Sequence, residues 1–504
     1  MSNPTEALKE PAIPPGEFLG HPKALWQLSN IEMWERFSYY GMRALLAVYV
    51  ATTFFSQMGD QANSQASLVY GGYTALVYAT GIIGGYIADH VLGYQRSILL
   101  GAIIMAAGLF VLLIEDLNWF LVGLALIVAG NGLFKPNIST MIGKLYKPDD
   151  VRRDSGFTIF YMGINLGALI APIITASWIG ATWGFKWGFF AAAIGMILST
   201  LFLEVAKRSL GHVGLPPKDK DGWGRFFLVG IGALVMAIGV FFLLSASEIL
   251  GWLLGFIMLG LIAYFIISGV KSGDKVQLQR YIAMIILFVA NACFWALFEQ
   301  AGSSMNFFAR EFVTPMFGSM ESWQAGGFGI FQSLNPLYIL LFAPLFAAIW
   351  PWLDKRNINP SIPRKFALGL IQVSLGFYVL VFAIANFQNA AGLVPWFFLA
   401  FCYLLHTTGE LCLSPIGLSM VTKLAAEKET GMAMGGWFLS IAMAQYVAGL
   451  IAAIASGGGH GPEAGAAITQ YSDTYMLLFL VGLGFGVFYL VVAPLINKLM
   501  HGVK

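Results

Sequence analysis

A short segment near the start of the chain places acids, arginines and tyrosines along one side of a helix. Its members are Glu32, Glu35, Arg36, Tyr39, Tyr40 and Arg43. Relative to the first acid they stand at i, i+3, i+4, i+7, i+8 and i+11, which is a single helical stripe. Ionisable groups inside a membrane-spanning helix are costly and are usually kept for function. The stripe predicts a wet cavity in which carboxyl groups take up and release protons, or structural ion pairs with neighbouring helices.

Three further charged residues stand alone in apolar surroundings. Lys135 lies in GNGLFKPNIST, Glu299 in FWALFEQAGSS and Glu410 in HTTGELCLSP. The N-terminal part of the chain thus supplies the buried cations, and the C-terminal part supplies lone acids. A cavity between the two parts would suit a zwitterion, with a carboxylate at one end and an ammonium at the other. Nucleobases, plain sugars and inorganic anions would not use both poles.

The composition indicates a lipid environment for these helices. Of the 504 residues, 58% are hydrophobic and 11% are charged, whereas soluble domains have about 25% charged residues. The 58 glycines and 14 tryptophans are typical of membrane helices, because glycine allows close packing and tryptophan favours the interface. The net charge is only +2. This composition excludes a water-soluble enzyme, a disordered regulator and a nucleic-acid binder, and predicts an all-α polytopic membrane protein.

The spans can be counted from the stretches that lack charge, since a spanning helix needs about 20 mostly apolar residues. Runs without Asp, Glu, Lys or Arg are 61–88, 97–114, 117–134, 155–185, 187–203, 226–247, 249–270, 281–298, 322–353, 366–409, 430–462 and 474–497. A first helix near 28–54 and a division of 366–409 at Asn386–Pro395 bring the prediction to fourteen transmembrane helices. No signal peptide is expected, and residues 1–25 are predicted to be a short disordered cytoplasmic tail.

The distribution of basic residues predicts the orientation. When loops are assigned to alternate sides, 23 of the 28 Lys and Arg fall on the side of the N-terminus. Only Lys186 and Arg310 fall on the other side, and Arg36, Arg43 and Lys135 lie inside helices. By the positive-inside rule the first side is cytoplasmic, so both termini are expected in the cytoplasm. The chain itself is expected in a bacterial inner (plasma) membrane.

Residues and short motifs that recur at similar offsets in the two parts of the chain predict an internal duplication. Asp89 and Asp354 stand 265 residues apart, and Glu35 and Glu299 stand 264 apart. Gly130-x5-Pro136 recurs as Gly409-x5-Pro415. Two parallel six-helix bundles are the plan of major facilitator transporters, whose substrates bind between the bundles. The predicted domains are an N-terminal bundle at 26–208, a linker with a two-helix insertion at 209–275, and a C-terminal bundle at 276–504.

The motifs of the chain resemble those of the proton-dependent oligopeptide transporter (POT) family, bacterial type. Glu32-x-x-Glu35-Arg36-Phe37-x-Tyr39-Tyr40-Gly41 resembles the ExxERFxYYG motif of that family. Further similar blocks are GNGLFKPNIST, FTIFYMGINLGALIAP, FWALFEQAGSS, QSLNP and GELCLSPIGLSMVTKL, and the two extra spans resemble the bacterial insertion. The resemblance covers residue 32 to about 437. It implies a symporter that imports di- and tripeptides with protons by alternating access.

The resemblance also implies roles for individual residues. Proton coupling would involve Glu32, Glu35, Arg36, Lys135 and Glu299. Arg43 and Lys135 would receive the peptide carboxylate, and Glu410 with Asn165 and Asn335 would receive the amino terminus. Tyr39, Tyr40 and Tyr78 would bond the peptide backbone, Glu299 would line the site, and Trp295 and Trp437 would wall side-chain pockets. The gating pairs would be Arg43 with Glu299 and Lys135 with Glu410. Ala433 departs from the serine found in some members, which leaves side-chain preference open.

Other functions remain as alternatives at this stage. The first is a major facilitator carrier for another small solute, such as nitrate or a drug-like molecule, and the second is a membrane receptor that does not transport. His406 stands four residues before Glu410, but there is no HExxH motif, so no metal site is expected. No cofactor besides the coupling protons is expected. The expected partners are peptides, protons and membrane lipids, not nucleic acid, and a monomer is compatible with the sequence.

Overall fold

The structure is a computed structural model that describes residues 16–147, 150–216, 222–457 and 464–503. Within these ranges thirteen helices are long and apolar enough to cross a membrane. Helix α1 (Lys23–Thr53) adds a fourteenth, because its 31 residues extend over roughly 46 Å, more than the ~30 Å hydrocarbon core. The charged stripe lowers the apolar character of α1 without shortening it. The predicted all-α polytopic fold is therefore confirmed.

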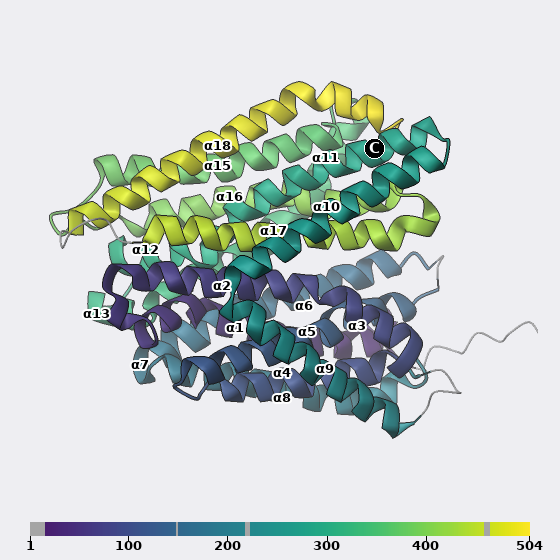
Figure 1. Cartoon of the computed structure of the whole chain (residues 1–504), viewed down its shortest axis with the longest axis horizontal. Coiled ribbons are helices and arrows are strands. Elements are labelled where there is room, and N and C mark those ends of the chain that lie inside the picture. Colours follow the sequence, from purple (N-terminus) through teal and green to yellow (C-terminus); the bar gives the residue numbers. More distant parts are fainter. Residues whose placement is uncertain (1–15, 148–149, 217–221, 458–463, 504) are drawn as a thin grey trace, which may run out of the picture.

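The helices before residue 211 form the lower group in Figure 1. They are α1, α2 (Ala62–Ala79), α3 (Gly81–Ile87), α4 (Tyr94–Val111), α5 (Leu117–Lys144), α6 (Arg153–Pro172), α7 (Ala181–Trp183) and α8 (Phe185–Leu210). Three short segments connect or extend them: η1 (Ser56–Gln61), η2 (Ala88–Leu92) and η3 (Ile173–Gly180). α1 packs against α6 and α8, and α4 packs against α5. The α4–α5 contact is close because a Cβ on Gly101 would lie 2.6 Å from the Gly130 carbonyl oxygen.

Most of the helices after residue 274 form the upper group in Figure 1, whereas α13 (Met320–Ala325) lies at the level of the lower group. The helices after residue 274 are α11 (Lys275–Phe298), α12 (Ser304–Phe312), α13, α14 (Leu334–Lys355), α15 (Ile362–Asn386), α16 (Trp396–Leu424), α17 (Thr430–Ser456) and α18 (Ala464–Leu499), with the short helices η5 (Glu299–Gly302), η6 (Gly327–Ser333) and η7 (Glu427–Glu429). α15 packs against both α16 and α18, and α11 packs against α17. We call these two groups the N-half and the C-half.

The halves touch mainly through α2 against α17 and α6 against α14. In the first contact a Cβ on Gly71 would lie 2.6 Å from Cα of Gly449, so the two backbones meet directly. Hydrogen bonds between the halves join Asn63 to Glu311, Ser67 to Ser456, Ser177 to Gly327, Asn306 to Ala44, Ser333 to Leu169 and Arg43 to Glu299. These residues lie from the middle of the helices towards the end at which α1 stops and α2 begins. We call that end the outer end.

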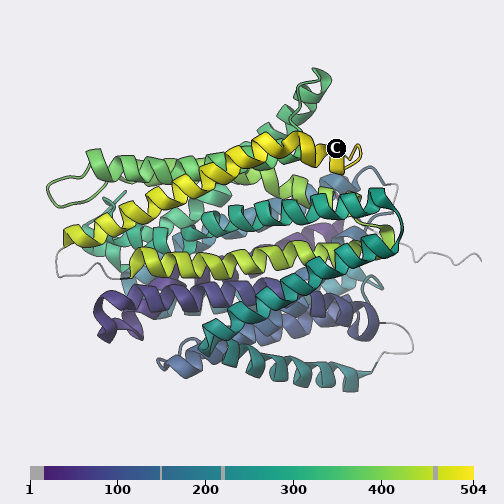
Figure 2. The ribbon, with the colours of Figure 1, turned by 45° about the horizontal axis from the view of Figure 1, so that its top comes forward.

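The two inserted helices straddle the halves. α9 (Trp223–Ser245) packs on α5, α4 and α2, whereas α10 (Ser247–Lys271) packs on α11 and α17. In Figures 1 and 2 the pair diverges from its common turn, so that each helix follows a different half. Glu429, at the start of α17, accepts hydrogen bonds from Ser268 (2.5 Å) and Tyr264 (3.2 Å) of α10. The prediction of an inserted helix pair is borne out by these two helices.

Several spans have other ends than the sequence predicts. Two of them continue past a charged residue, because a single charge does not end a span. The span expected at 117–134 continues through Lys135 and Pro136 to Lys144. The span expected at 281–298 continues past Glu299 through η5 and α12 to Phe312. The predicted division of 366–409 is correct, since α15 ends at Asn386 and α16 begins after Pro395. The span expected at 61–88 is interrupted at Thr80, between α2 and α3.

The predicted disordered tail over residues 1–25 is wrong for its last ten residues, and its first fifteen lie outside the described residues. β1 (Glu17–Phe18) pairs with β2 (His21–Pro22) in an antiparallel turn that leads into α1. Nδ1 of His21 lies 2.8 Å from the Tyr146 hydroxyl, and Arg152 pairs with Glu17 at 2.9 Å. Hydrogen bonds from Arg152 also hold the pKa of Asp150 below its ordinary value. These contacts stabilise the segment against the N-half.

Candidate functional site

The stripe on α1 forms a compact ionic cluster inside the N-half. Glu32, Glu35 and Arg36 are 2%, 0% and 3% exposed. Nε of Arg36 lies 3.2 Å from Oε1 of Glu32, and Nη2 donates to Oε1 of Glu35 at 2.7 Å. Asn131 of α5 reaches the same Glu35 oxygen at 3.5 Å. Oε2 of Glu32 is buried without a hydrogen-bond partner among the described residues, so this oxygen can accept a proton without breaking a bond.

Lys135 joins this cluster from the neighbouring helix α5. Its Nζ lies 4.7 Å from the centroid of the Tyr78 ring, which belongs to α2. Among the described residues it forms no ion pair, although Arg36, Glu35 and Glu32 are near enough to act on it electrostatically. Pro136 follows directly within the helix, and proline removes a backbone hydrogen bond there. An unpaired ammonium held beside aromatic rings is suited to receive an anion.

A second charged group closes the contact between the halves. Nη2 of Arg43 pairs with Glu299, and Nε of Arg43 donates to the Tyr70 hydroxyl. The arginine is 12% exposed and the glutamate 2%. Glu299 occupies this position because α11 ends at Phe298 and the chain continues as the short turn η5. Of the two predicted gating pairs, this one is formed.

The third charged element lies in the C-half on α16. Oε2 of Glu410 accepts a hydrogen bond from Nδ2 of Asn335 at 2.8 Å, and the same amide contacts Oγ1 of Thr407 at 3.1 Å. Glu410 is partly exposed and forms no ion pair with Lys135 or another described cation. Asn335 reaches it from the first turn of α14, next to Pro336. The carboxyl group is thus oriented by neutral groups and has no described cation as a partner.

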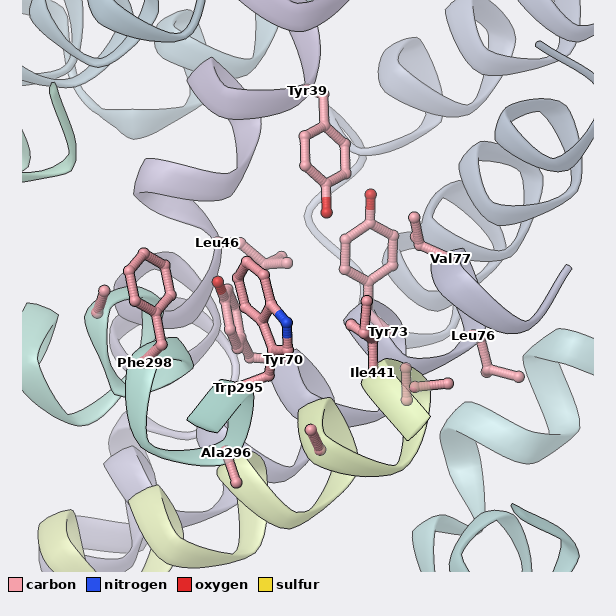
Figure 3. Close-up of a cluster of buried hydrophobic side chains, with 14 of the residues drawn as sticks. Tyr39, Leu46, Tyr70, Tyr73, Leu76, Val77, Trp295, Ala296, Phe298 and Ile441 are labelled. Carbon is pink, nitrogen blue, oxygen red and sulfur yellow. The ribbon is translucent and has the colours of Figure 1, made fainter. Parts of the chain in front are cut away.

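Aromatic side chains form a wall of mostly buried rings close to these charges, with Arg36 near the Tyr39 ring and Arg43 near the Tyr40 and Tyr70 rings. Figure 3 shows Tyr39 and Tyr73 with their hydroxyls directed towards each other, and Trp295 beside Tyr70 and Phe298. Tyr39 and Tyr40 form an edge-to-face pair with ring centroids 5.3 Å apart. Because the tyrosine hydroxyls can donate and accept hydrogen bonds, this wall suits a polar ligand with an apolar side chain.

The remaining predicted residues occupy different positions. Asn165 is 4% exposed and donates to the Tyr161 carbonyl of its own helix at 2.9 Å. Trp295 is 9% exposed, with its Nε1 buried and unpartnered. Trp437 is 2% exposed and packs on Gly417, where a Cβ would lie only 2.1 Å from the indole. In this arrangement Trp437 belongs to the packed interior of the C-half, and its expected role at a side-chain pocket stays a prediction.

The structure adds residues that the sequence reasoning missed. Tyr70 contacts Arg43, Asn131 contacts Glu35 and Thr407 contacts Asn335. Each stands three, four or eight positions before a predicted residue: Asn131 before Lys135, Thr407 before Glu410, and Tyr70 before Tyr78. Residues at these spacings share a helix face. Extending the helical stripe from each predicted residue would therefore have found them.

Comparisons with known proteins show the family to which the chain belongs. The sequence model of the POT family matches residues 95–466. The chain belongs to the POT family. This family member is 38% identical to the uncharacterised transporter YclF of Bacillus subtilis over 98% of each chain. It is 36% identical to the peptide transporter YePEPT of Yersinia enterocolitica over 88% of each chain.

The solved structures place the fold in the same family. A crystal structure of a POT family transporter in complex with a thioalcohol-conjugated peptide matches with a TM-score of 0.79 and 31% identity, over 96% of this chain and 99% of that one. The expected major facilitator arrangement of two bundles plus two extra helices is therefore confirmed. POT proteins are transporters, so this chain is a multi-pass membrane transporter and not an enzyme.

Proposed function

We propose that the protein is a proton-coupled symporter that imports di- and tripeptides by alternating access between its two halves. Peptide transport is supported by the relatives, since YePEPT is named a peptide transporter and the matched crystal structure holds a conjugated peptide. The proposal places both termini in the cytoplasm and the chain in the bacterial inner membrane. It divides the chain into bundles at 26–208 and 276–504, joined by the insertion at 209–275.

One observation carries the mechanism: the pair Arg43–Glu299 is formed, while Lys135 and Glu410 remain without ionic partners among the described residues. Contacts between the halves lie from the middle of the helices towards the outer end, so the outer gate is closed. The two unpaired charges belong to opposite halves and carry opposite signs. A peptide carboxylate would bind Lys135 and Arg43, and a peptide ammonium would bind Glu410 beside Asn335.

Proton coupling would arise because protons compete with Arg36 and Arg43 for the carboxylates that pair with these two arginines. Protonation of Glu299 neutralises the partner of Arg43 and weakens outer closure, which opens the site outwards. Protonation of Glu32 or Glu35 weakens the ion pairs of Arg36 and changes the electrostatic potential at Lys135. When a proton leaves towards the cytoplasm, the ionic cluster re-forms and the bundles return. Rocking of the two halves then moves peptide and proton together.

The proposal is tested by uptake into proteoliposomes with an imposed pH gradient. Labelled dialanine should accumulate when the outside is acidic, and a protonophore should abolish accumulation while leaving peptide exchange. Unlabelled di- and tripeptides should compete, whereas nitrate should not. Accumulation that survives the protonophore but requires sodium would overturn the coupling ion. Competition by nitrate alone would favour a carrier for another solute.

A further inference from the structure

A polar pocket lies at the end of the C-half away from the outer gate, outside the transport site. Its volume is about 360 Å³, and it forms between the end of α14, the start of α15 and the end of α18 with the residues that follow it. Side chains and backbone from these three segments line it: Asp354, Asn359, Ser361, Lys365, Asn497 and Val503. None of these residues takes part in the peptide or proton contacts described above.

Lys365 places a positive charge in the pocket. The side chain is 8% exposed, and its Nζ lies 4.3 Å from the centroid of the Trp350 ring. Within the described part of the chain the ammonium forms no ion pair and no hydrogen bond. An aromatic face offsets only part of the cost of burying an ammonium, and a hydrogen-bonded anion would offset much more.

The start of α15 adds donors to the same pocket. Ser361 caps the helix with its backbone, but its hydroxyl makes no capping bond and is buried without a partner among the described residues. The amide groups of the first helical turn have no partner within the helix and carry partial positive charge. Pro363 has no N–H, so the amides of Ile362 and Arg364 are the ones left to donate. A helix start of this kind binds phosphate groups readily.

The surroundings of the pocket favour an anion. The short connection around it carries Lys355, Arg356 and Arg364, all exposed. Asp354 is the acid in the lining; it accepts a hydrogen bond from Asn359 at 3.4 Å and is exposed, so solvent and salt weaken its effect on Lys365 and on a bound anion. The guanidinium of Arg356 lies 3.8 Å from the ring centroid of Trp352, a tryptophan that is 49% exposed. An exposed tryptophan beside basic residues is typical of the membrane interface.

We propose that this pocket binds a phosphate group, with Lys365, the Ser361 hydroxyl and the first amides of α15 as its donors. With the orientation proposed above, it opens at the cytoplasmic leaflet, where anionic phospholipids present phosphate groups. Phosphate free in the cytoplasm offers the same chemistry. Occupation of the pocket would tie α14, α15 and the end of α18 together at the lipid surface.

The test uses the full purified chain in two arms. In the first, native mass spectrometry measures how many phosphatidylglycerol molecules the protein retains, against phosphatidylcholine as the neutral comparison. In the second, inorganic phosphate is titrated in the absence of lipid while hydrogen exchange is followed at residues 357–366. Lys365→Gln should weaken binding about tenfold or more, because it removes a charged donor.

Ser361→Asp is the sharper variant. Aspartate is a good N-cap, so α15 should keep its stability, yet the added carboxylate repels phosphate and should weaken binding about tenfold. Lys355→Gln, an exposed lysine of the same connection that does not line the pocket, is the matched control and should bind as the parent does. Peptide uptake should persist in all three variants, which separates this test from that of the proposed function.

Each outcome decides the proposal. Retention of phosphatidylglycerol without protection by inorganic phosphate identifies a lipid head group as the ligand, and protection by inorganic phosphate alone identifies the free anion. Absence of both effects overturns the proposal. Equal losses in Lys355→Gln and Lys365→Gln also overturn it, because they would reflect general surface charge. If Lys365→Gln fails to fold, Ser361→Asp decides the matter.

Discussion

Replacing Glu299 by glutamine should loosen the outer gate by a measurable amount. The carboxylate is 2% exposed and pairs with Arg43, which also donates to the Tyr70 hydroxyl. Removing one partner of a buried ion pair costs about 3–5 kcal/mol. Glutamine still offers an oxygen, and Tyr70 remains, so loss of one charge-assisted bond, about 1.5–3 kcal/mol, is the better figure. The ratio of outer-closed to outer-open protein should therefore fall roughly 10- to 100-fold.

The change can be measured as a distance between the halves. Spin labels at Met58 and Phe317, which are 42% and 47% exposed near the outer end of the N-half and C-half, would report on the gate in nanodiscs. Double electron–electron resonance should show a longer-distance population that grows in Glu299→Gln. The pair Lys186–Glu115 is the matched control, since its members are 48% and 59% exposed and both belong to the N-half. Such surface pairs contribute at most about 1 kcal/mol, so Glu115→Gln should leave the distances unchanged.

An unchanged distance distribution in Glu299→Gln would refute the gating role. A second variant checks the reasoning about burial, because it replaces Arg43 and Glu299 together by leucine. Apolar replacement of both partners removes the unpaired charge and should restore outer closure, although peptide binding would be lost with Arg43. If the double variant opens the gate as far as Glu299→Gln does, charge pairing is not what holds the outer end closed.

The remaining predictions concern coupling, substrate recognition and packing. Glu32→Gln and Glu35→Gln should abolish proton-driven accumulation but leave peptide counterflow partly intact, because these acids pair with Arg36 inside the N-half, apart from Glu410. Lys135→Ala and Glu410→Ala should each abolish uptake, and Glu410→Ala should weaken competition by free-amine peptides at least tenfold more than by N-acetylated ones, through loss of a charged partner. Gly71→Ala should impair uptake strongly, because a Cβ there would lie 2.6 Å from the Gly449 backbone.

Each of these predictions has a result that would contradict it, and the prediction for Gly71 has a control variant in the same helix. If Glu32→Gln and Glu35→Gln lost counterflow, accumulation and peptide affinity together, these two acids would belong to the binding site. A Glu410→Ala protein that separates acetylated from free peptides as the parent does would remove Glu410 from amine recognition. Gly72 is the control for Gly71, since a Cβ on it meets only Leu250 and Leu244 side chains at 3.5 and 3.6 Å. Equal effects of Gly71→Ala and Gly72→Ala would contradict the packing argument.

Much of the architecture could be predicted from the chain itself. Lipid requires each spanning segment to satisfy its own backbone, so the number and type of elements follow from apolar runs alone. The charged stripe on α1 could be found for a related reason, because 3.6 residues per turn bring its members to one face in any helix. The ends of spans were harder to predict. Helix α5 continues past Lys135, and the span that begins with α11 continues past Glu299 through η5 and α12, because neighbouring helices shield these charges from lipid.

The partners of the charges were decided only by the tertiary structure. Arg43 and Glu299 are 256 residues apart in the chain, and their pairing depends on how two halves meet at the outer end. The sequence was compatible with a pair between Lys135 and Glu410 as well, and this one is not formed in the structure. Likewise, the resemblance to the family implies a pocket role for Trp437 as well as for Trp295, and only the tertiary structure shows that Trp437 is buried against Gly417. Helix periodicity determines which residues share a face, whereas the crossing of helices determines what that face contacts.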